Sequence, residues 1–198
     1  MRKTKIVALA GVMSALMFVV LLLETYVFIA FIKPSPAFLS IPIAISLSVY
    51  GNKKTMFLGG TVFGICSFVL SFIVGYITFY NPLISVLPRV MMGIIAYFAC
   101  TMILRLTKNS KNGFLKNVLP YSVGGLFGVL ANTCLVLLSM SIFSGDPFID
   151  TAIGVILGLN FSLELICAII LVPILVAAIK EYNDNNKSIN DDVIKEEE

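Results

Sequence analysis

Long apolar runs dominate the chain, and short polar segments separate them. Six runs are long enough, or nearly long enough, to cross a membrane as helices, at about residues 5–24, 37–51, 55–75, 83–105, 118–143 and 152–180. The second run is short and contains Pro42, so we expect its helix to be kinked or partly buried by its neighbours. The pattern predicts an all-α integral membrane protein, a six-transmembrane-helix bundle within residues 1–180.

The polar pattern changes at both ends of the chain. Residues 181–198 read EYNDNNKSINDDVIKEEE, which buries little apolar surface and predicts a disordered polar, acidic tail. The first run follows basic residues, is long for the apolar region of a signal peptide, and lacks a clear A-x-A cleavage site. We therefore interpret it as a retained first span.

Composition supports the membrane assignment. Hydrophobic residues make up 59% of the chain and charged residues only 13%, against about a quarter in soluble domains. The mean hydropathy is +1.00. The apolar runs far exceed the roughly ten-residue alternating segments of a transmembrane β-barrel, so the spans are predicted to be helices.

Charge sorting predicts the orientation of the bundle. In a six-span arrangement one side receives nearly all of the basic residues: Arg2, Lys3, Lys5, Lys53, Lys54, Arg105, Lys108, Lys111, Lys116, Lys180 and Lys187. The opposite loops hold Lys33 with Glu24, Asp146 and Asp150. The positive-inside rule then places both termini, and the tail at 181–198, in the cytoplasm.

Arg89 is the one full charge within the apolar segment FYNPLISVLPRVMMGIIAYFACTMIL. A guanidinium at or below the bilayer interface costs a few kcal/mol unless something pairs with it. Its natural partners are carboxylates and phosphates, which predicts a clamp for an anionic group in an outward-facing cavity. The alternative is an arginine whose side chain extends to the outer headgroups.

Three more polar residues interrupt apolar runs. Asn160 and Glu164 share one face of the sixth span, and Glu164 lies near its middle, where a lone carboxylate is costly. Glu164 either contacts a ligand or holds the bundle together, for instance by pairing with Arg89. Asn132 in the fifth span is either a ligand contact or a hydrogen-bonding link between helices.

Phe79, Tyr80 and Asn81 precede the fourth span and are expected at the outer interface. Aromatic residues there are usually part of the interfacial belt, although these three could also cap a pocket.

Small residues recur at four-residue spacing in the first span, as Ala10 with Ser14 and Gly11 with Ala15. Such spacing lets another helix approach closely, either within the bundle or from a partner protein.

Several kinds of chemistry lack their usual residues. Histidine is absent, and the four cysteines lie in apolar stretches without a CxxC spacing, so we expect no metal and no cofactor. The sequence contains no P-loop motif, no HExxH and no GxSxG. We therefore expect neither an ATPase nor an intramembrane hydrolase, and classify the chain as not an enzyme.

The segments ALAGVMSALMFVV, YNPLISVLPRVMMG, GVLANTCLVL and NFSLE, with the size and predicted topology, resemble a known family. Over about residues 3–180 the chain is similar to the substrate-binding S-components of energy-coupling factor (ECF) vitamin transporters. It is most similar to the pantothenate type.

The resemblance implies a subunit in a prokaryotic plasma membrane that binds a vitamin from outside at high affinity. It implies partners in a membrane coupling (T) subunit and two cytoplasmic ATPase subunits, against which the S-component reorients in the bilayer, and no nucleic acid. The small-residue face with Gly11 and Ala15 would meet the coupling subunit, and the loops 26–35 and 76–82 would form a lid.

The ligand implied first is pantothenate, with its carboxylate on Arg89 and its polar remainder on Asn132, Asn160 and Glu164. Folate, a pyridine vitamin and riboflavin are alternatives. A further alternative is a structural membrane protein without ligand, in which these residues only hold the helices together.

Overall fold

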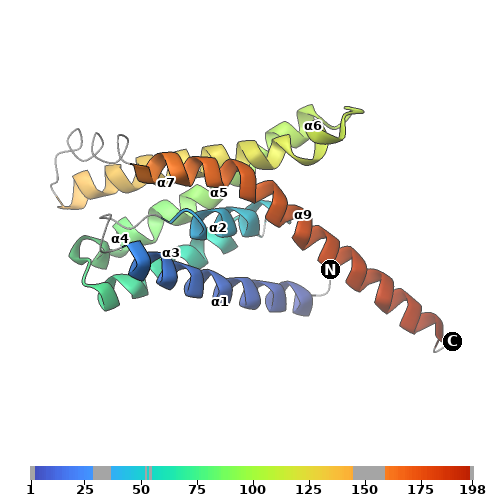
Figure 1. Ribbon diagram of the computed structural model, residues 1–198, viewed down its shortest axis with the longest axis horizontal. Helices are drawn as coiled ribbons and strands as arrows, with labels where there is room; N and C mark the ends of the chain where they lie inside the picture. The colour runs from blue at the N-terminus through green and yellow to red at the C-terminus, as the bar shows by residue number, and fades with distance from the viewer. Residues whose placement is uncertain (1–2, 29–36, 52, 54, 145–158, 197–198) are drawn as a thin grey trace.

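A computed structural model describes residues 3–28, 37–51, 53, 55–144 and 159–196, and within these ranges it contains helices and no strand. The principal helices are α1 (Lys3–Phe28), α2 (Ser40–Val49), α3 (Leu58–Val74), α5 (Leu87–Leu106), α7 (Leu119–Ser144) and α9 (Leu159–Glu196). Three short elements connect them: η1 (Ile77–Tyr80), α4 (Pro82–Ser85) and α6 (Gly113–Asn117). Figure 1 shows the helices gathered into one elongated bundle.

Three stretches are long and apolar enough to cross a membrane, Pro82–Leu106, Leu119–Phe143 and Phe161–Tyr182. Three shorter apolar stretches accompany them, Ser14–Val27, Ser40–Val49 and Leu58–Val74. The helices confirm the prediction of an all-helical protein whose composition suits a membrane. The count of six spans, and the side on which the termini lie, stay predictions.

The short helix α2 lies at the centre of the bundle (Figure 1). It contacts α1, α3, α5, α7 and α9, and all of its residues are buried. A helix that is apolar on every side is typical of such a position. Its serine hydroxyls donate to the preceding turn, Ser46 to Pro42 O at 2.7 Å and Ser48 to Ala44 O at 3.1 Å, so they need no outside partner. Pro42 lies in the first turn, where a helix tolerates proline.

The backbones of α2, α3 and α5 approach one another closely at three glycines. We call these residues, Gly59, Gly60 and Gly93, the glycine seam. A Cβ on Gly59 would lie 1.8 Å from the carbonyl oxygen of Ala44, and a Cβ on Gly60 would lie 2.2 Å from the carbonyl oxygen of Arg89. Side chains are thus excluded from this seam. The seam also fixes the position of α5 at Arg89.

Glu24 was expected in a loop, but α1 continues to Phe28 and buries this side chain. Its carboxylate accepts hydrogen bonds from the backbone N–H groups of Leu39 (2.6 Å) and Ser40 (3.3 Å), and from the Ser40 hydroxyl. The first N–H groups of a helix have no partner within it and favour a negative charge. Glu24 therefore ties α1 to the start of α2.

The two ends of the bundle differ in what they carry. Figure 1 shows the start of α1, the short helix α6 and the C-terminal part of α9 toward one end, and η1 with α4 toward the other. The start of α1, α6 and the end of α9, which were predicted to be cytoplasmic from their basic residues, thus lie toward a common end.

The tail, expected to be disordered, continues α9 as a helix through Glu196 (Figure 1). A helix that is already formed lengthens without the cost of a new nucleus, which gives a physical reason for the continuation.

Candidate functional site

A cavity of about 520 Å³ opens between the helices near η1. Residues of α1, α2, α3, η1, α5, α7 and α9 line it. Its volume falls within the roughly 300–1,000 Å³ of small-molecule sites. Apolar side chains such as Leu21, Ile41 and Met140 form much of the wall, and a small number of polar groups lie among them.

Arg89 enters the cavity from the first turn of α5, and a proline explains its orientation. Pro88 has no N–H to donate to the carbonyl of Ile84, four residues earlier, so that oxygen lacks its helical partner. Arg89 Nη1 donates to this oxygen at 2.7 Å. The hydrogen bond anchors one corner of the guanidinium inside the protein, with Arg89 only 7% exposed.

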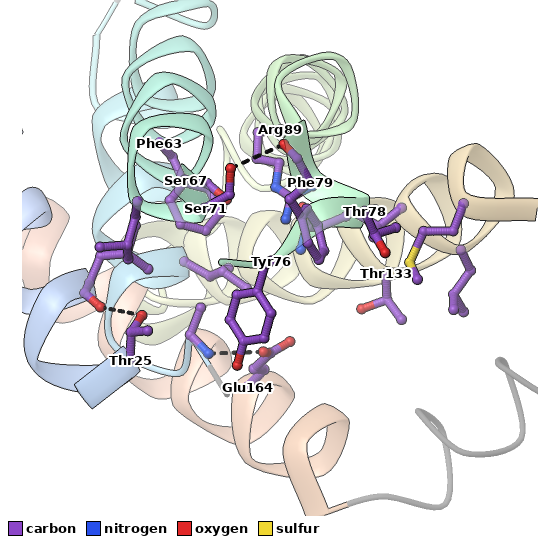
Figure 2. Close-up of a pocket in the computed structure, with 18 of the residues that line it drawn as sticks. Thr25, Phe63, Ser67, Ser71, Tyr76, Thr78, Phe79, Arg89, Thr133 and Glu164 are labelled. Carbon is purple, nitrogen blue, oxygen red and sulfur yellow. Dashed lines mark hydrogen bonds between the residues drawn. The ribbon is translucent and has the colours of Figure 1, made fainter. Parts of the chain in front are cut away.

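Another nitrogen of the Arg89 guanidinium is unsatisfied. Its Nε is buried and has no hydrogen-bond partner among the described residues. Its central carbon lies 5.1 Å from the ring centre of Phe79 and 5.9 Å from that of Phe63, at distances where aromatic faces attract a cation. Figure 2 shows the guanidinium behind the Phe79 ring. A buried donor without an acceptor is costly, so this arrangement favours an anion that enters the cavity.

Two further buried polar atoms on the cavity wall also lack partners. They are Asn132 Oδ1 on α7 and the hydroxyl of Tyr76, between α3 and η1. Asn132 is 7% exposed. Buried polar atoms are almost always hydrogen-bonded, so unpaired atoms from different elements around one cavity indicate a missing polar ligand.

Glu164 lies on the cavity wall in α9 and accepts a hydrogen bond from the backbone N–H of Ala37 at 3.1 Å (Figure 2). Within the described part of the chain, the structure records no ion pair between Glu164 and Arg89. The internal pairing that the sequence left open is therefore not formed in this structure. Both charged side chains line one cavity without neutralising each other directly.

The segment after α3 lies within the expected lid at residues 76–82, and it contributes two aromatic residues to the cavity wall. Gly75 ends α3 with a φ of 80°, a left-handed conformation that favours glycine, and the chain then turns into η1. The Ser71 hydroxyl lies 3.3 Å from the carbonyl oxygen of Phe79 and ties η1 to α3. Tyr76 and Phe79 are thereby placed on the wall. In the sequence, the glycine followed by aromatic residues is the signal that points to this turn.

Tyr80 and Asn81 are placed differently from the residues above and are not part of the cavity wall. Tyr80 stacks on Phe72 with ring centres 4.4 Å apart. Asn81 Oδ1 accepts from Leu83 N at 3.0 Å and caps α4, with Pro82 following at the first helical position. This placement gives Asn81 a structural role.

Asn160 lies in the first turn of α9, one turn before Glu164, and its side chain is outside the described part of the structure.

On α1, Gly11 and Ala15 are exposed, Ser14 is partly buried, and the side chain of Ala10 is not described. Of the expected lid, residues 26–28 belong to α1 and not to a loop, and residues 29–35 lie outside the described ranges, whereas residues 76–79 line the cavity.

The cavity wall presents groups that can bind a polar molecule. Its described residues include one cation, one carboxylate, amide and hydroxyl groups, and aromatic rings. Among the described residues, no group of three or more histidine, cysteine, aspartate or glutamate side chains is placed to hold a metal ion. The arrangement suits a small molecule with an acidic group and other polar atoms.

Comparison with known proteins gives one informative relative. The chain is 28% identical, over 209 aligned residues, to "Pantothenic acid transporter PanT" of Lactococcus lactis subsp. cremoris (strain MG1363). The alignment covers 94% of this chain and 100% of that protein. No family model matches the chain, and no solved structure matches it.

Proposed function

We propose that this protein is the substrate-binding subunit of a vitamin importer and that its ligand is pantothenate. The observation that carries the proposal is the cavity in which the Arg89 Nε, the Asn132 Oδ1 and the Tyr76 hydroxyl are buried without partners. Similarity to a pantothenic acid transporter along nearly the whole chain supports a role in vitamin transport.

Pantothenate has a carboxylate at one end, an amide in the middle and two hydroxyls at the other end. In the proposed complex its carboxylate pairs with the free edge of Arg89, a side-on geometry that forms charge-assisted hydrogen bonds. Asn132 on α7 forms a hydrogen bond with the amide or a hydroxyl of the ligand, and the apolar wall surrounds the dimethyl group. The Arg89 Nε and the Asn132 Oδ1 would then each have a hydrogen-bond partner.

The proposal includes the machinery that the family resemblance implies. The chain would span a prokaryotic plasma membrane six times with both termini in the cytoplasm, and would take the vitamin from outside. A coupling (T) subunit with two ATPase subunits would supply energy, since the sequence has no P-loop of its own. The face of α1 with Ala10, Gly11, Ser14 and Ala15 would meet the coupling subunit.

Ligand binding by the purified chain tests the proposal. The protein is prepared in detergent and titrated calorimetrically with pantothenate, folate, riboflavin and a pyridine vitamin in separate experiments. We expect stoichiometric binding of pantothenate and a raised unfolding temperature in its presence. If none of the vitamins binds to folded protein, a structural role without ligand replaces this proposal. If another vitamin binds in its place, the role stands and the ligand is wrong.

A further inference from the structure

The cavity wall has a second polar region, formed by Tyr76 and Glu164 and separate from Arg89. Tyr76 comes from the turn between α3 and η1, and Glu164 comes from α9. Figure 2 shows the Tyr76 ring extending away from Arg89, with its hydroxyl pointing toward Glu164. No hydrogen bond joins them, because the Tyr76 hydroxyl is buried without a partner in the described part of the chain.

Both groups have unused hydrogen-bonding capacity. A carboxylate offers about four acceptor sites. Among the described residues, the Glu164 side chain accepts one hydrogen bond, from the Ala37 N–H. A phenol hydroxyl both donates and accepts. A ligand hydroxyl or amide N–H between them would donate to Glu164 and exchange a hydrogen bond with Tyr76.

A comparison with Glu24 sharpens this interpretation. The Glu24 carboxylate receives donors from Leu39 and Ser40 and is occupied by the start of α2. Glu164 holds the same segment through Ala37 alone and faces the cavity. Glu24 thus already fixes the start of α2, which leaves Glu164 available to a ligand.

We propose that Tyr76 and Glu164 select ligands that carry hydroxyl donors at the end remote from a single carboxylate, with Tyr76 as a specificity-determining residue. The inference rests on the proposed function, because it takes Arg89 as the anchor of the carboxylate. An acid without such donors leaves the Tyr76 hydroxyl unpaired. A ligand with a second carboxylate places like charges together at Glu164.

The test compares pantothenate with the analogue in which both of its hydroxyls are replaced by hydrogen. Each compound is titrated into the full-length wild-type chain in detergent, and into the Tyr76→Phe, Glu164→Gln and Tyr97→Phe variants. Tyr97→Phe is the matched control, since Tyr97 lies on α5 against Phe98 and is not on the cavity wall. Tyr76→Phe removes an atom that has no partner within the protein, so the variant should remain folded.

We expect the wild-type chain to prefer pantothenate over the analogue by about tenfold or more. Tyr76→Phe should weaken pantothenate binding about three- to tenfold and leave the affinity for the analogue unchanged, so that the preference shrinks. Glu164→Gln should reduce the preference too, and Tyr97→Phe should preserve it.

An undiminished preference in both Tyr76→Phe and Glu164→Gln, with pantothenate still bound, overturns the inference and leaves the proposed function standing. Binding of neither compound to the wild-type chain overturns both. A preference that falls equally in Tyr97→Phe also counts against the inference, because the effect would then not belong to this part of the wall.

Discussion

The glycine seam and the cavity wall share helices α3 and α5, yet they differ in whether their polar groups have hydrogen-bond partners. In the seam, glycines bring backbones together, and the hydroxyls of Ser46 and Ser48 on neighbouring α2 donate to their own helix. On the cavity wall, the Arg89 Nε and the Asn132 Oδ1 are buried without partners. A fully satisfied region is typical of structure, whereas an unsatisfied region of the same bundle indicates a ligand.

The seam also explains how the cavity wall is positioned. The carbonyl of Arg89 lies directly against Gly60, so the backbone that carries the guanidinium cannot move toward α3. A binding group needs such rigid support, because small displacements weaken its contacts. Substitutions in the two regions should therefore have different effects, with seam variants losing stability and wall variants losing affinity.

Arg89→Ala should produce the largest change in affinity. Truncation of one member of a buried charge pair typically costs about 2–5 kcal/mol, so pantothenate binding should fall at least thirtyfold or so. The affinity of Arg89→Lys for pantothenate should lie between that of the wild-type chain and that of Arg89→Ala, because lysine keeps the charge and loses the planar fork. Titration calorimetry measures both variants, with Arg105→Ala at the far end of α5 as the control. Normal binding by Arg89→Ala would show that Arg89 does not anchor the ligand.

Gly59→Ala should produce the largest loss of stability. Its methyl group would lie 1.8 Å from the carbonyl oxygen of Ala44, and backbone has to move to admit it. Overpacking of this kind costs about 1–3 kcal/mol or more. Thermal unfolding followed by circular dichroism measures the effect. Gly113→Ala is the matched control, since a Cβ there meets nothing within 4 Å. Equal unfolding temperatures for the two variants would show that the seam is not tightly packed.

Asn132→Leu should separate affinity from stability. The substitution removes a buried oxygen that has no partner, so the ligand-free protein should become as stable as the wild-type chain or slightly more stable. Pantothenate should bind about three- to tenfold more weakly. Unfolding temperatures with and without ligand test both effects. A marked loss of stability in the ligand-free state would assign Asn132 to structure.

Ser46→Ala in α2 should have the smallest effect. Its hydroxyl donates within its own helix at 2.7 Å and does not face the cavity, so we expect a change in unfolding free energy below about 1 kcal/mol. Affinity for pantothenate should equal that of the wild-type chain. A clear loss of binding would show that the seam and the cavity wall are more strongly coupled than the contacts indicate.

The sequence alone selected three polar residues that line the cavity. Arg89, Asn132 and Glu164 interrupt apolar runs, where each costs free energy unless it has a role, and all three line the cavity. Their mutual geometry was not predictable, because it depends on how α5, α7 and α9 pack. The Glu164 carboxylate accordingly meets the N–H of Ala37 instead of Arg89.

Local chemistry explains why the sequence did not assign individual roles to the aromatic residues of the segment at 76–82. Tyr76 and Phe79 look like interfacial aromatics, and the turn at Gly75 brings them to the cavity. Asn81 lies beside them in sequence, yet the dipeptide Asn-Pro makes it a helix cap. Helix content was easy to predict from long apolar runs, whereas the end of α1 beyond Glu24 depended on a contact with the start of α2.

Native mass spectrometry of the gently purified chain, alongside Arg89→Ala, tests the central claim most directly, because a tightly held guest is weighed with the protein. We predict that the wild-type chain carries one added mass equal to that of pantothenate, and that the folded Arg89→Ala protein carries none. A wild-type spectrum with no small molecule, even after incubation with pantothenate, would contradict the claim that this cavity exists to bind an acid.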